Sequence, residues 1–363
     1  MKKSLLALAV FGAFAGAAQA QSSITIYGLI DQGIVHSSNA APNGDSKTAL
    51  AAATQSNRIG FTGTEDLGSG MKAFFRLESQ FLGDTGAIDD PTASSVLFRR
   101  AANVGLAGGF GTLTLGRQTD PFYIAYASGD TRPAYLMGSS LQPFVKAGRA
   151  ANMQLLWVDN GISYTTPDLN GFKATVYYAF GEQTGDSSAG KQQGLTANYV
   201  AGPLTVNAGF VQTYSKTAGT TFGEKNGQAY TINGGYTFGP ATVRASWSSF
   251  KDPIIDAKFD VYGLSALYAV SSTVDVSAGY YRLNGKNVTA AQDANLFGVE
   301  ADYKLSKRTT LYAAYARSND GQVLGALHST GAGTAPTGAG ASGAGGNEKD
   351  TQNVFAVGVR HTF

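Results

Sequence analysis

Apolar and polar side chains alternate with a period of two over nearly the whole chain after residue 21, and no other feature constrains the fold as strongly. In the stretch MKAFFRLESQF, for example, Phe75 and Leu77 alternate with Arg76 and Glu78. A period of two places successive side chains on opposite faces of an extended strand. A helix would repeat every 3.6 residues, so the sequence predicts an all-β protein.

The connections between the expected strands alternate between short and long. Tight turns such as 65 to 70 and 238 to 240 alternate with long polar segments such as 118 to 152 and 319 to 350. A soluble β-sandwich keeps its connections short at both ends, whereas outer-membrane barrels have short turns at one end and longer loops at the other. Counting strands gives about sixteen, an even number that such barrels use. We therefore expect a transmembrane antiparallel β-barrel.

The last residues, NVFAVGVRHTF, keep the same alternation and end on the aromatic Phe363. An unpaired strand edge in lipid leaves backbone N–H and C=O groups without partners. We therefore expect the last strand, from 352 to 363, to pair with the first strand, from 22 to 36, and so to close the barrel.

Residues 1 to 20 have the features of a secretory signal peptide. Lys2 and Lys3 precede an apolar run from 5 to 18, and the segment ends in AQA, a small-x-small pattern for signal peptidase. A membrane anchor is the weaker alternative, because the run is shorter than the roughly 20 residues of a spanning helix. We expect the segment to be cleaved and residues 21 to 363 to form a single barrel domain.

Composition narrows the class of protein further. The chain has 27 Lys and Arg against 25 Asp and Glu, and loss of Lys2 and Lys3 leaves a net charge near zero, which gives no support for a nucleic-acid partner. Cysteine is absent, so a disulfide scaffold is excluded. The 47 Gly, 18 Tyr and 20 Phe residues favour tight turns and aromatic girdles at the rims of a membrane barrel.

Five stretches of the sequence are recognisable together. They are SSITIYGLIDQGI near the start, SNRIGFTGTEDLGSGMKAFFRLESQF (56 to 81), FRRAANVGLAGGFGTLTLGRQ (98 to 118), DNGISYTTPDLNGFKATVYYAFGE (159 to 182) and the final VGVRHTF. With these stretches the chain resembles the Gram-negative general-diffusion porins, in particular the β-proteobacterial branch. The resemblance implies a trimer in the outer membrane, surrounded by lipid and lipopolysaccharide. It also implies a third external loop folded into the lumen, and a water-filled channel for passive diffusion of small hydrophilic solutes and ions.

The resemblance further implies that Phe363 is read by the machinery that inserts barrels into the outer membrane. An ordinary place among the rim aromatics is the alternative for Phe363, and the two roles are compatible. No cofactor, metal or enzymatic activity is implied. The three histidines are scattered, without metal-ligand spacing or a partner nucleophile, which argues against a barrel enzyme.

The segment from 118 to 152 is the best candidate for the loop that narrows the channel, because a long loop without strand pattern usually has a function. Its charged residues are Asp120, Asp130, Arg132, Lys146 and Arg149. By resemblance, the facing wall presents a basic cluster, which would consist of Arg58, Arg76, Arg99, Arg100 and Arg117. Adjacent residues of a strand face opposite ways, so only one of Arg99 and Arg100 is expected to face the lumen. The direction of Arg117 stays open.

Arginine remains charged at any relevant pH, and arginines lining a narrow wet pore favour anions. The alternative for each one is an ion pair with a carboxylate such as Glu78, or a place near the lipid headgroups. A charge on the lipid face costs roughly 2 to 4 kcal/mol at mid-membrane, which favours the lumen for the group. Porins of this family often carry an arginine where Trp157 and Val158 stand here, so the predicted anion preference is weak.

Other functions remain open at this point. A substrate-selective channel would need aromatic residues along its path or a denser basic track. The aromatic residues of the candidate loop are Phe122, Tyr123, Tyr126, Tyr135 and Phe144. Packing of the loop against the wall is the favoured interpretation of these residues. A surface adhesin is supported only by the long loops.

Overall fold

The computed structural model describes residues 23–41, 43–89, 96–133, 135–151, 153, 155–215, 225–287, 293–320, 323–324 and 351–363. The expected signal peptide, residues 1 to 20, lies outside the described residues. Within the described part, no helix is both long enough and apolar enough to cross a membrane.

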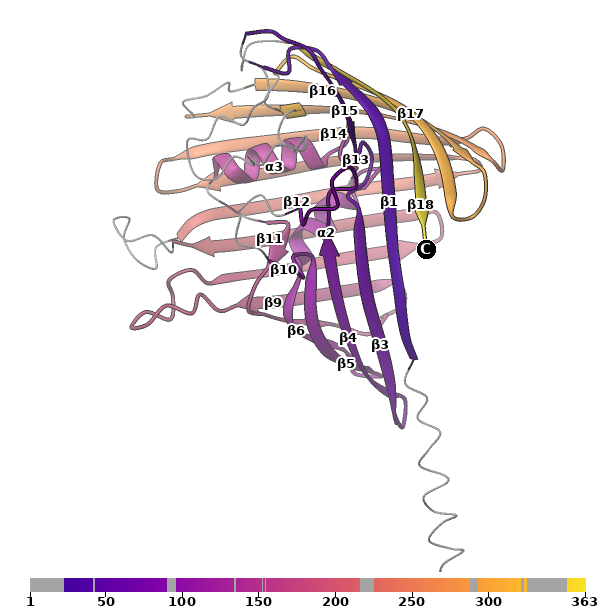
Figure 1. Ribbon diagram of the computed structural model, residues 1–363. Coiled ribbons are helices and arrows are strands. Elements are labelled where there is room, and N and C mark those ends of the chain that lie inside the picture. Colours follow the sequence, from indigo (N-terminus) through magenta and orange to yellow (C-terminus); the bar gives the residue numbers. More distant parts are fainter. Residues whose placement is uncertain are drawn as a thin grey trace, which may run out of the picture.

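One antiparallel sheet curls round and closes on itself (Figure 1). Its strands are β1 (Ser23–Ser37), β2 (Lys47–Ala51), β3 (Arg58–Gly68), β4 (Met71–Gln80), β5 (Ala101–Gly108), β6 (Gly111–Thr119), β7 (Trp157–Val158), β8 (Gly161–Thr165), β9 (Phe172–Ala179), β10 (Gln192–Ala201), β11 (Leu204–Tyr214), β12 (Lys225–Phe238), β13 (Ala241–Asp252), β14 (Ala257–Ala269), β15 (Val274–Lys286), β16 (Asp293–Lys304), β17 (Thr309–Ser318) and β18 (Gln352–Thr362). Two of these eighteen described strands, β2 and β7, are short additions, so sixteen strands make the ring. The predicted barrel and its strand number are confirmed.

The period of two in the sequence corresponds to side chains that alternate between the outer and the inner face of the barrel wall. In β1, Ile24 and Ile26 point outward and are 68% and 60% exposed, whereas Leu29, Asp31 and Val35 on the other face are buried. The outer face therefore carries apolar side chains that lipid can solvate, and the inner face carries the polar and packed residues.

The first and last strands close the ring, as expected. β18 pairs with β1 from Leu29 opposite Thr362 to Ser37 opposite Val354. Beyond the ladder, the N–H of Gly28 donates to the carbonyl of Phe363 at 2.9 Å, and the reverse bond measures 3.1 Å. A Cβ atom at Gly28 would lie 2.3 Å from the ring of Phe363, so only glycine lets that ring approach the first strand.

The structure differs from the expected strands in three places. The strand expected from 95 to 106 begins only at Ala101. The sixth strand, expected from 153 to 165, is interrupted, and its two parts β7 and β8 both pair with β6. Asn160 lies in the interruption with a φ of 53°, a left-handed conformation that asparagine tolerates better than most residues. The third difference is β2, which extends the first hairpin within a segment expected to be a loop.

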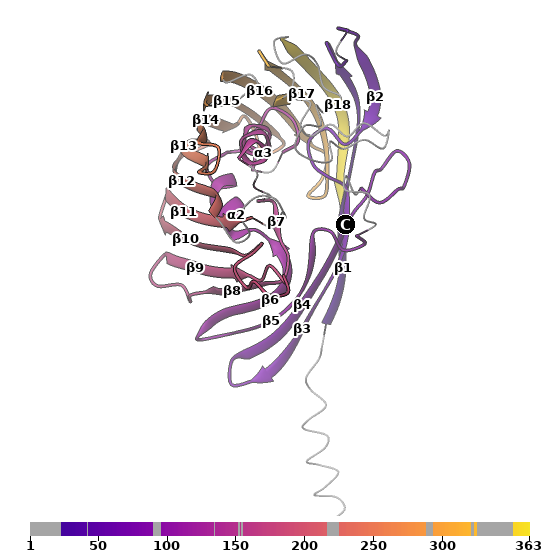
Figure 2. The same cartoon turned by 90° about the vertical axis from the view of Figure 1, so that its left-hand side faces the viewer.

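The long segment after β6 contains two helices that the sequence pattern did not predict, α2 (Pro121–Ala127) and α3 (Leu141–Ala150). Asp120 caps α2 by accepting a hydrogen bond from the N–H of Phe122 at 2.8 Å, and Pro121 follows in the first turn. α2 packs against β10, β11 and β12, and α3 packs against β14 and β15. Figure 2 shows both helices inside the ring of strands.

Candidate functional site

The arginines of the expected basic cluster come from one region of the wall. Arg58 begins β3, Arg76 lies in β4, and Arg117 lies near the end of β6. Arg99 and Arg100 come directly before β5. Four of these five side chains are brought together by two shared partners, Glu78 and Trp157.

Glu78 holds two of the arginines. Its Oε2 lies 2.5 Å from Nη2 of Arg76, and its Oε1 pairs with Nε of Arg100. Tyr27 adds a link, because its hydroxyl donates to Glu78 at 2.7 Å and accepts from Nε of Arg76 at 2.8 Å. The side chain of Glu78 is only 2% exposed, whereas that of Arg76 is 47% exposed. The buried carboxylate therefore orients an arginine whose guanidinium group remains in open space.

Trp157 is the second point where arginines meet. The guanidinium carbon of Arg99 lies 4.8 Å from the centre of the Trp157 ring, and those of Arg100 and Arg117 each lie 5.9 Å away. The alternation expected for Arg99 and Arg100 does not apply, since both precede the first residue of β5. Trp157 thus contacts three arginines by cation–π interaction.

In the described part of the chain, carboxylates neutralise only part of the charge of the arginine wall, which consists of Arg58, Arg76, Arg99, Arg100 and Arg117. Glu78 pairs with Arg76 and Arg100. Arg99 lies 3.6 Å from Asp89, and Arg117 pairs with Asp159. Arg58 donates to the side chain of Gln55 at 3.1 Å and has no ion pair in the part of the chain that the structure describes. Among the residues that the structure describes, five arginines face three carboxylates, which is an excess of two positive charges.

The charged residues of the long loop are placed differently. Asp120 and Asp130 are almost completely buried. Asp120 accepts from Nε2 of Gln192 at 2.5 Å, and burial raises the pKa of the Asp120 carboxyl to about 6. Asp130 accepts from the hydroxyl of Tyr281 at 2.6 Å and from the N–H of Ser140 at 2.7 Å.

Arg132 and Lys146 are likewise turned toward the wall. Arg132 is 2% exposed and donates to the carbonyl oxygens of Gly138 and Gly298. Lys146 pairs with the buried Asp320. Arg149 lies in α3, and its side chain is outside the described residues. The four described loop charges therefore fasten the loop to the wall, whereas the side chain of Arg76 is half exposed.

The aromatic residues of the loop form a core between loop and wall. Phe144 lies at the centre, with its ring 4.6 Å from that of Tyr126, 5.0 Å from that of Tyr123 and 5.5 Å from that of Phe250 in β13. Phe122 joins the same cluster. All of these rings are buried, so the packing interpretation of the loop aromatics is confirmed for them.

A second group of charges was not found from the sequence. Asp31 in β1 is fully buried and accepts from the N–H groups of Thr54 at 3.0 Å and Gln55 at 2.7 Å and from the hydroxyl of Tyr312 at 2.5 Å. Arg360 in β18 donates to the hydroxyl of Thr54 at 2.7 Å. These residues fold the segment between β2 and β3 onto the inner wall.

This buried network also reaches the long loop. The N–H of Leu136 donates to the carbonyl of Thr54 at 2.8 Å, and the guanidinium of Arg360 lies 5.2 Å from the ring centre of Tyr135. Arg360 pairs in turn with Asp302 at 3.1 Å. The members come from β1, β16, β17 and β18, so no spacing along the sequence could have grouped them.

Three asparagines on neighbouring strands hold α2 in place. Nδ2 of Asn198 donates to Oδ1 of Asn207 at 2.7 Å, and Nδ2 of Asn207 donates to Oδ1 of Asn233 at 2.8 Å. Asn233 then donates to the carbonyl of Ala125 at 2.8 Å. Arg244 in β13 donates to the carbonyl of Ser128, which follows the helix. The wall therefore satisfies carbonyl groups that the end of a helix leaves unpaired.

Comparison with known proteins identifies the chain. Residues 6–322 match the family model described as Gram-negative porin. The chain belongs to the Gram-negative porin family. It is 34% identical over 378 residues to outer membrane porin protein 32 of Delftia acidovorans, with both chains covered completely. It is also 30% identical to an outer membrane porin protein of Bordetella pertussis, covering 88% of this chain and 95% of that protein.

A solved structure agrees with the barrel described above. The anion-selective porin from Comamonas acidovorans superimposes with a TM-score of 0.77 at 30% identity, covering 94% of this chain and 100% of that chain. The protein is thus a porin, a channel protein of the outer membrane, as the sequence resemblance suggested. Within the ranges described, no three His, Asp or Glu side chains are placed so that they could hold a metal ion.

Proposed function

We propose that this porin is a weakly anion-selective channel for the passive diffusion of small hydrophilic solutes and ions. The observation that carries the proposal is Arg76, which is half exposed beside the buried Glu78 in an arginine wall where the described arginines outnumber the described carboxylates. Exposed guanidinium groups in a narrow wet passage raise the local concentration of anions. Anion selectivity is also the property named for the similar Comamonas porin.

The long loop would set the narrowest point of the channel. α2 and α3 lie within the ring of strands (Figure 2), and their contacts are with β10 to β12, β14 and β15. The arginine wall belongs to β3 to β6 and to the residues just before β5. The channel would therefore pass between a rigid loop on one side and a charged wall on the other.

Assembly of the porin would follow the pattern that the resemblance implies. The signal peptide would direct export and be cleaved, Phe363 would be read by the barrel-insertion machinery, and three copies would associate within lipid and lipopolysaccharide. Deleting Phe363 should lower the amount of heat-resistant trimer in the outer membrane. Normal trimer levels in the deletion variant would contradict the assembly role of Phe363.

The experiment that tests the channel proposal is conductance of the purified protein in a planar bilayer under a KCl gradient. We expect stepwise ohmic openings in groups of three and a reversal potential on the anion side. A potential on the cation side would refute the selectivity, and bilayers that stay closed would refute the open channel.

A substrate-selective channel is the second candidate. The buried position of Phe122, Tyr126 and Phe144 weighs against it, because aromatic rings that guide a sugar must line open space. Block of the current by one solute at low concentration, with related solutes inactive, would favour this candidate.

A further inference from the structure

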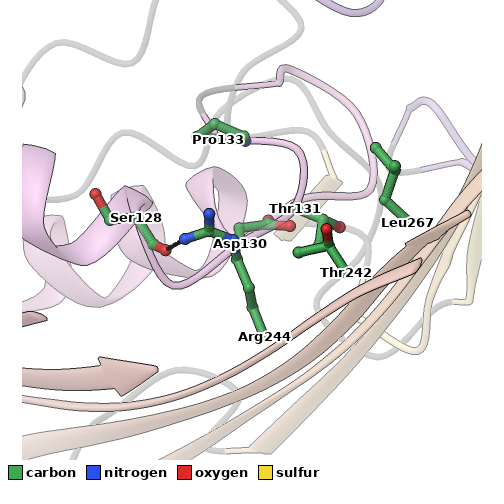
Figure 3. A pocket seen from close by; sticks show the side chains of 7 residues that line it. All are labelled: Ser128, Asp130, Thr131, Pro133, Thr242, Arg244 and Leu267. Carbon is green, nitrogen blue, oxygen red and sulfur yellow. Dashed lines mark hydrogen bonds between the residues drawn. The ribbon is translucent and has the colours of Figure 1, made fainter. Parts of the chain in front are cut away.

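A cavity of about 320 Å³ lies between the long loop and the wall opposite the arginine cluster. Its loop side is formed by residues that follow α2, among them Ser128 and Thr131, and its wall side by Thr242 and Arg244 of β13 and Leu267 of β14 (Figure 3). All three wall residues alternate with outward-facing neighbours, so they belong to the inner face of the barrel.

Arg244 is the charged group of this cavity. One nitrogen, Nη1, donates to the carbonyl of Ser128, which leaves most of the five N–H donors of a guanidinium group available. No ion pair of Arg244 occurs in the part of the chain that the structure describes, in contrast to Arg76 and Arg100, which share Glu78. Its positive charge is therefore not neutralised by a neighbouring carboxylate within ion-pair distance.

The pairing of β13 with β14 shows where the cavity lies along the barrel axis relative to the loop. Ser265 is paired with Arg244 in the sheet, and its hydroxyl accepts from the N–H of Thr131 at 3.0 Å, so loop and wall touch at the level of Arg244. Thr242 is paired with Leu267 two residues nearer to the short turn at Gly239 and Pro240. An ion in the cavity would therefore lie between the loop and the end of the barrel that carries the short turns.

Asp130 also borders the cavity, but its carboxylate is directed elsewhere. It is 1% exposed and accepts from Tyr281, Ser140 and the N–H of Arg132. These three donors occupy lone pairs of the carboxylate that a cation would need, and they stabilise its negative charge within the protein. In Figure 3 the guanidinium group of Arg244 reaches toward Ser128, and the hydroxyl-bearing side chains of Thr131 and Thr242 lie on its other side.

We propose that this cavity is a binding station for small oxyanions, that is, for solutes that carry a carboxylate or a phosphate group. Arg244 would bind the oxyanion with its free N–H donors, Thr131 and Thr242 would offer hydroxyl groups, and Leu267 would border the apolar part of an organic anion. Two N–H groups of one guanidinium match two oxygens of such a group. The proposal rests on the anion-selective channel proposed above and adds a second anion site on the opposite wall.

The test compares single-channel conductance in potassium phosphate and in potassium chloride over a range of concentrations. A binding station makes the current saturate, so we expect the phosphate curve of the unaltered porin to level off at a lower concentration than the chloride curve. Arg244→Gln should raise the half-saturating phosphate concentration by about threefold or more, the effect of losing one charged contact in a wet site. Arg244→Lys should lie between the two, because it keeps the charge and loses the paired donors.

Two further variants separate binding from folding. Thr242→Asp places a carboxylate in the cavity without removing the contact of Arg244 with Ser128, and it should also raise the half-saturating phosphate concentration. Arg282→Gln removes an arginine that is exposed on the outer face near the long connections, and it should leave the phosphate curve unchanged. Heat-resistant trimer and stepwise openings in KCl would show that each variant is assembled.

The outcomes also separate this proposal from the channel proposal. An anion-leaning porin whose phosphate curve is the same in Arg244→Gln and in the unaltered protein would overturn the binding station and leave the selectivity intact. Equal shifts of the half-saturating phosphate concentration in Arg244→Gln and Arg282→Gln would also overturn the binding station, because they would reflect the total charge of the porin and not a local site. A cation-leaning reversal potential in KCl would refute the underlying channel proposal whatever the phosphate curves show.

Discussion

The arginine wall and the network around Asp31 are built from the same residue types, yet they differ in their contact with water. On the wall, Glu78 is buried and the side chain of its partner Arg76 is 47% exposed. In the network, Asp31 is fully buried and the side chain of Arg360 is only 11% exposed. The difference lies in what covers the charges, because the segment between β2 and β3 and the long loop close over the network and leave the wall open.

This difference in exposure separates charges that stabilise the fold from charges that affect the passage of ions. A buried charge that loses its partner is strongly destabilising, since the low dielectric of the interior makes an unpaired charge costly. A guanidinium group in water contributes little to stability but still attracts passing anions. Substitutions in the network should therefore change folding, and substitutions on the wall should change which ions pass.

The largest effect is expected for Asp31→Ala, which leaves the N–H groups of Thr54 and Gln55 and the hydroxyl of Tyr312 without their acceptor. Each buried donor left unpaired costs about 1 to 3 kcal/mol, so we expect a loss of roughly 3 kcal/mol or more in the free energy of unfolding. Urea unfolding in detergent measures it. Asp84→Ala, at an exposed turn position, is the matched control. Similar stability of the two variants would show that the network does not hold the fold.

Asp120, which caps the start of α2, allows the cost of a buried charge to be tested by changing the pH. Its pKa of about 6 in the folded porin lies above the ordinary value of 3.8, so the folded state binds the proton more tightly than the unfolded chain. The resulting stabilisation is complete below about pH 4 and is lost as the pH rises to about 6, a change of at most about 3 kcal/mol. Asp120→Asn should remove this part of the pH dependence of unfolding. A variant that keeps the full dependence would contradict the assignment to Asp120.

A smaller effect, on ions and not on stability, is expected for the double variant Arg76→Gln and Arg100→Gln. It removes two positive charges and leaves Glu78 without its partners, so the permeability ratio should move toward cations by roughly threefold, equivalent to about 0.6 kcal/mol of ion energy. Reversal potentials in a KCl gradient measure it. Adding Glu78→Gln should restore part of the anion preference. An unchanged potential in the double variant would mean that these arginines do not border the ion path.

The smallest effect is expected for Trp157→Ala. Each cation–π contact at an exposed site is worth about 0.5 to 1 kcal/mol, and its loss frees Arg99, Arg100 and Arg117 without changing the net charge. We expect a shift in selectivity smaller than that of the arginine double variant, with noisier open-channel current. Trp157→Phe should lie closer to the unaltered porin. Trp247→Phe, on the outer face, is the control, and an equal effect of the two tryptophan positions would argue against the ring contacts.

The barrel could be predicted from the sequence because side chains alternate between the two faces of a strand, and because strand edges in a membrane must be paired. The period of two marks the inner face of β4, so Arg76 and Glu78 could be placed together before the structure was known. The same rule failed at Arg99 and Arg100, because the strand starts one residue later than the second of them. Arg244 was missed since it stands alone among small and apolar neighbours, and its meaning depends on a loop that folds back more than a hundred residues away along the chain.

The second half of the first strand is paired along both of its edges. Residues 23 to 29 pair with β3, residues 33 to 37 pair with β2, and residues 29 to 37 pair with β18 on the other side. The bonds from Tyr312 to Asp31 and from Arg360 to Thr54 span 281 and 306 positions of the chain.

These spans set an order of events. The segment between β2 and β3 is held by Asp31 of β1, and it gains its contact with Arg360 only when β18 has arrived beside β1. The long loop is bonded to the same segment through Leu136. A barrel that is still open during insertion therefore lacks the contact of Arg360 with Thr54. Closure by the last strand would thus also complete the contacts beneath the long loop.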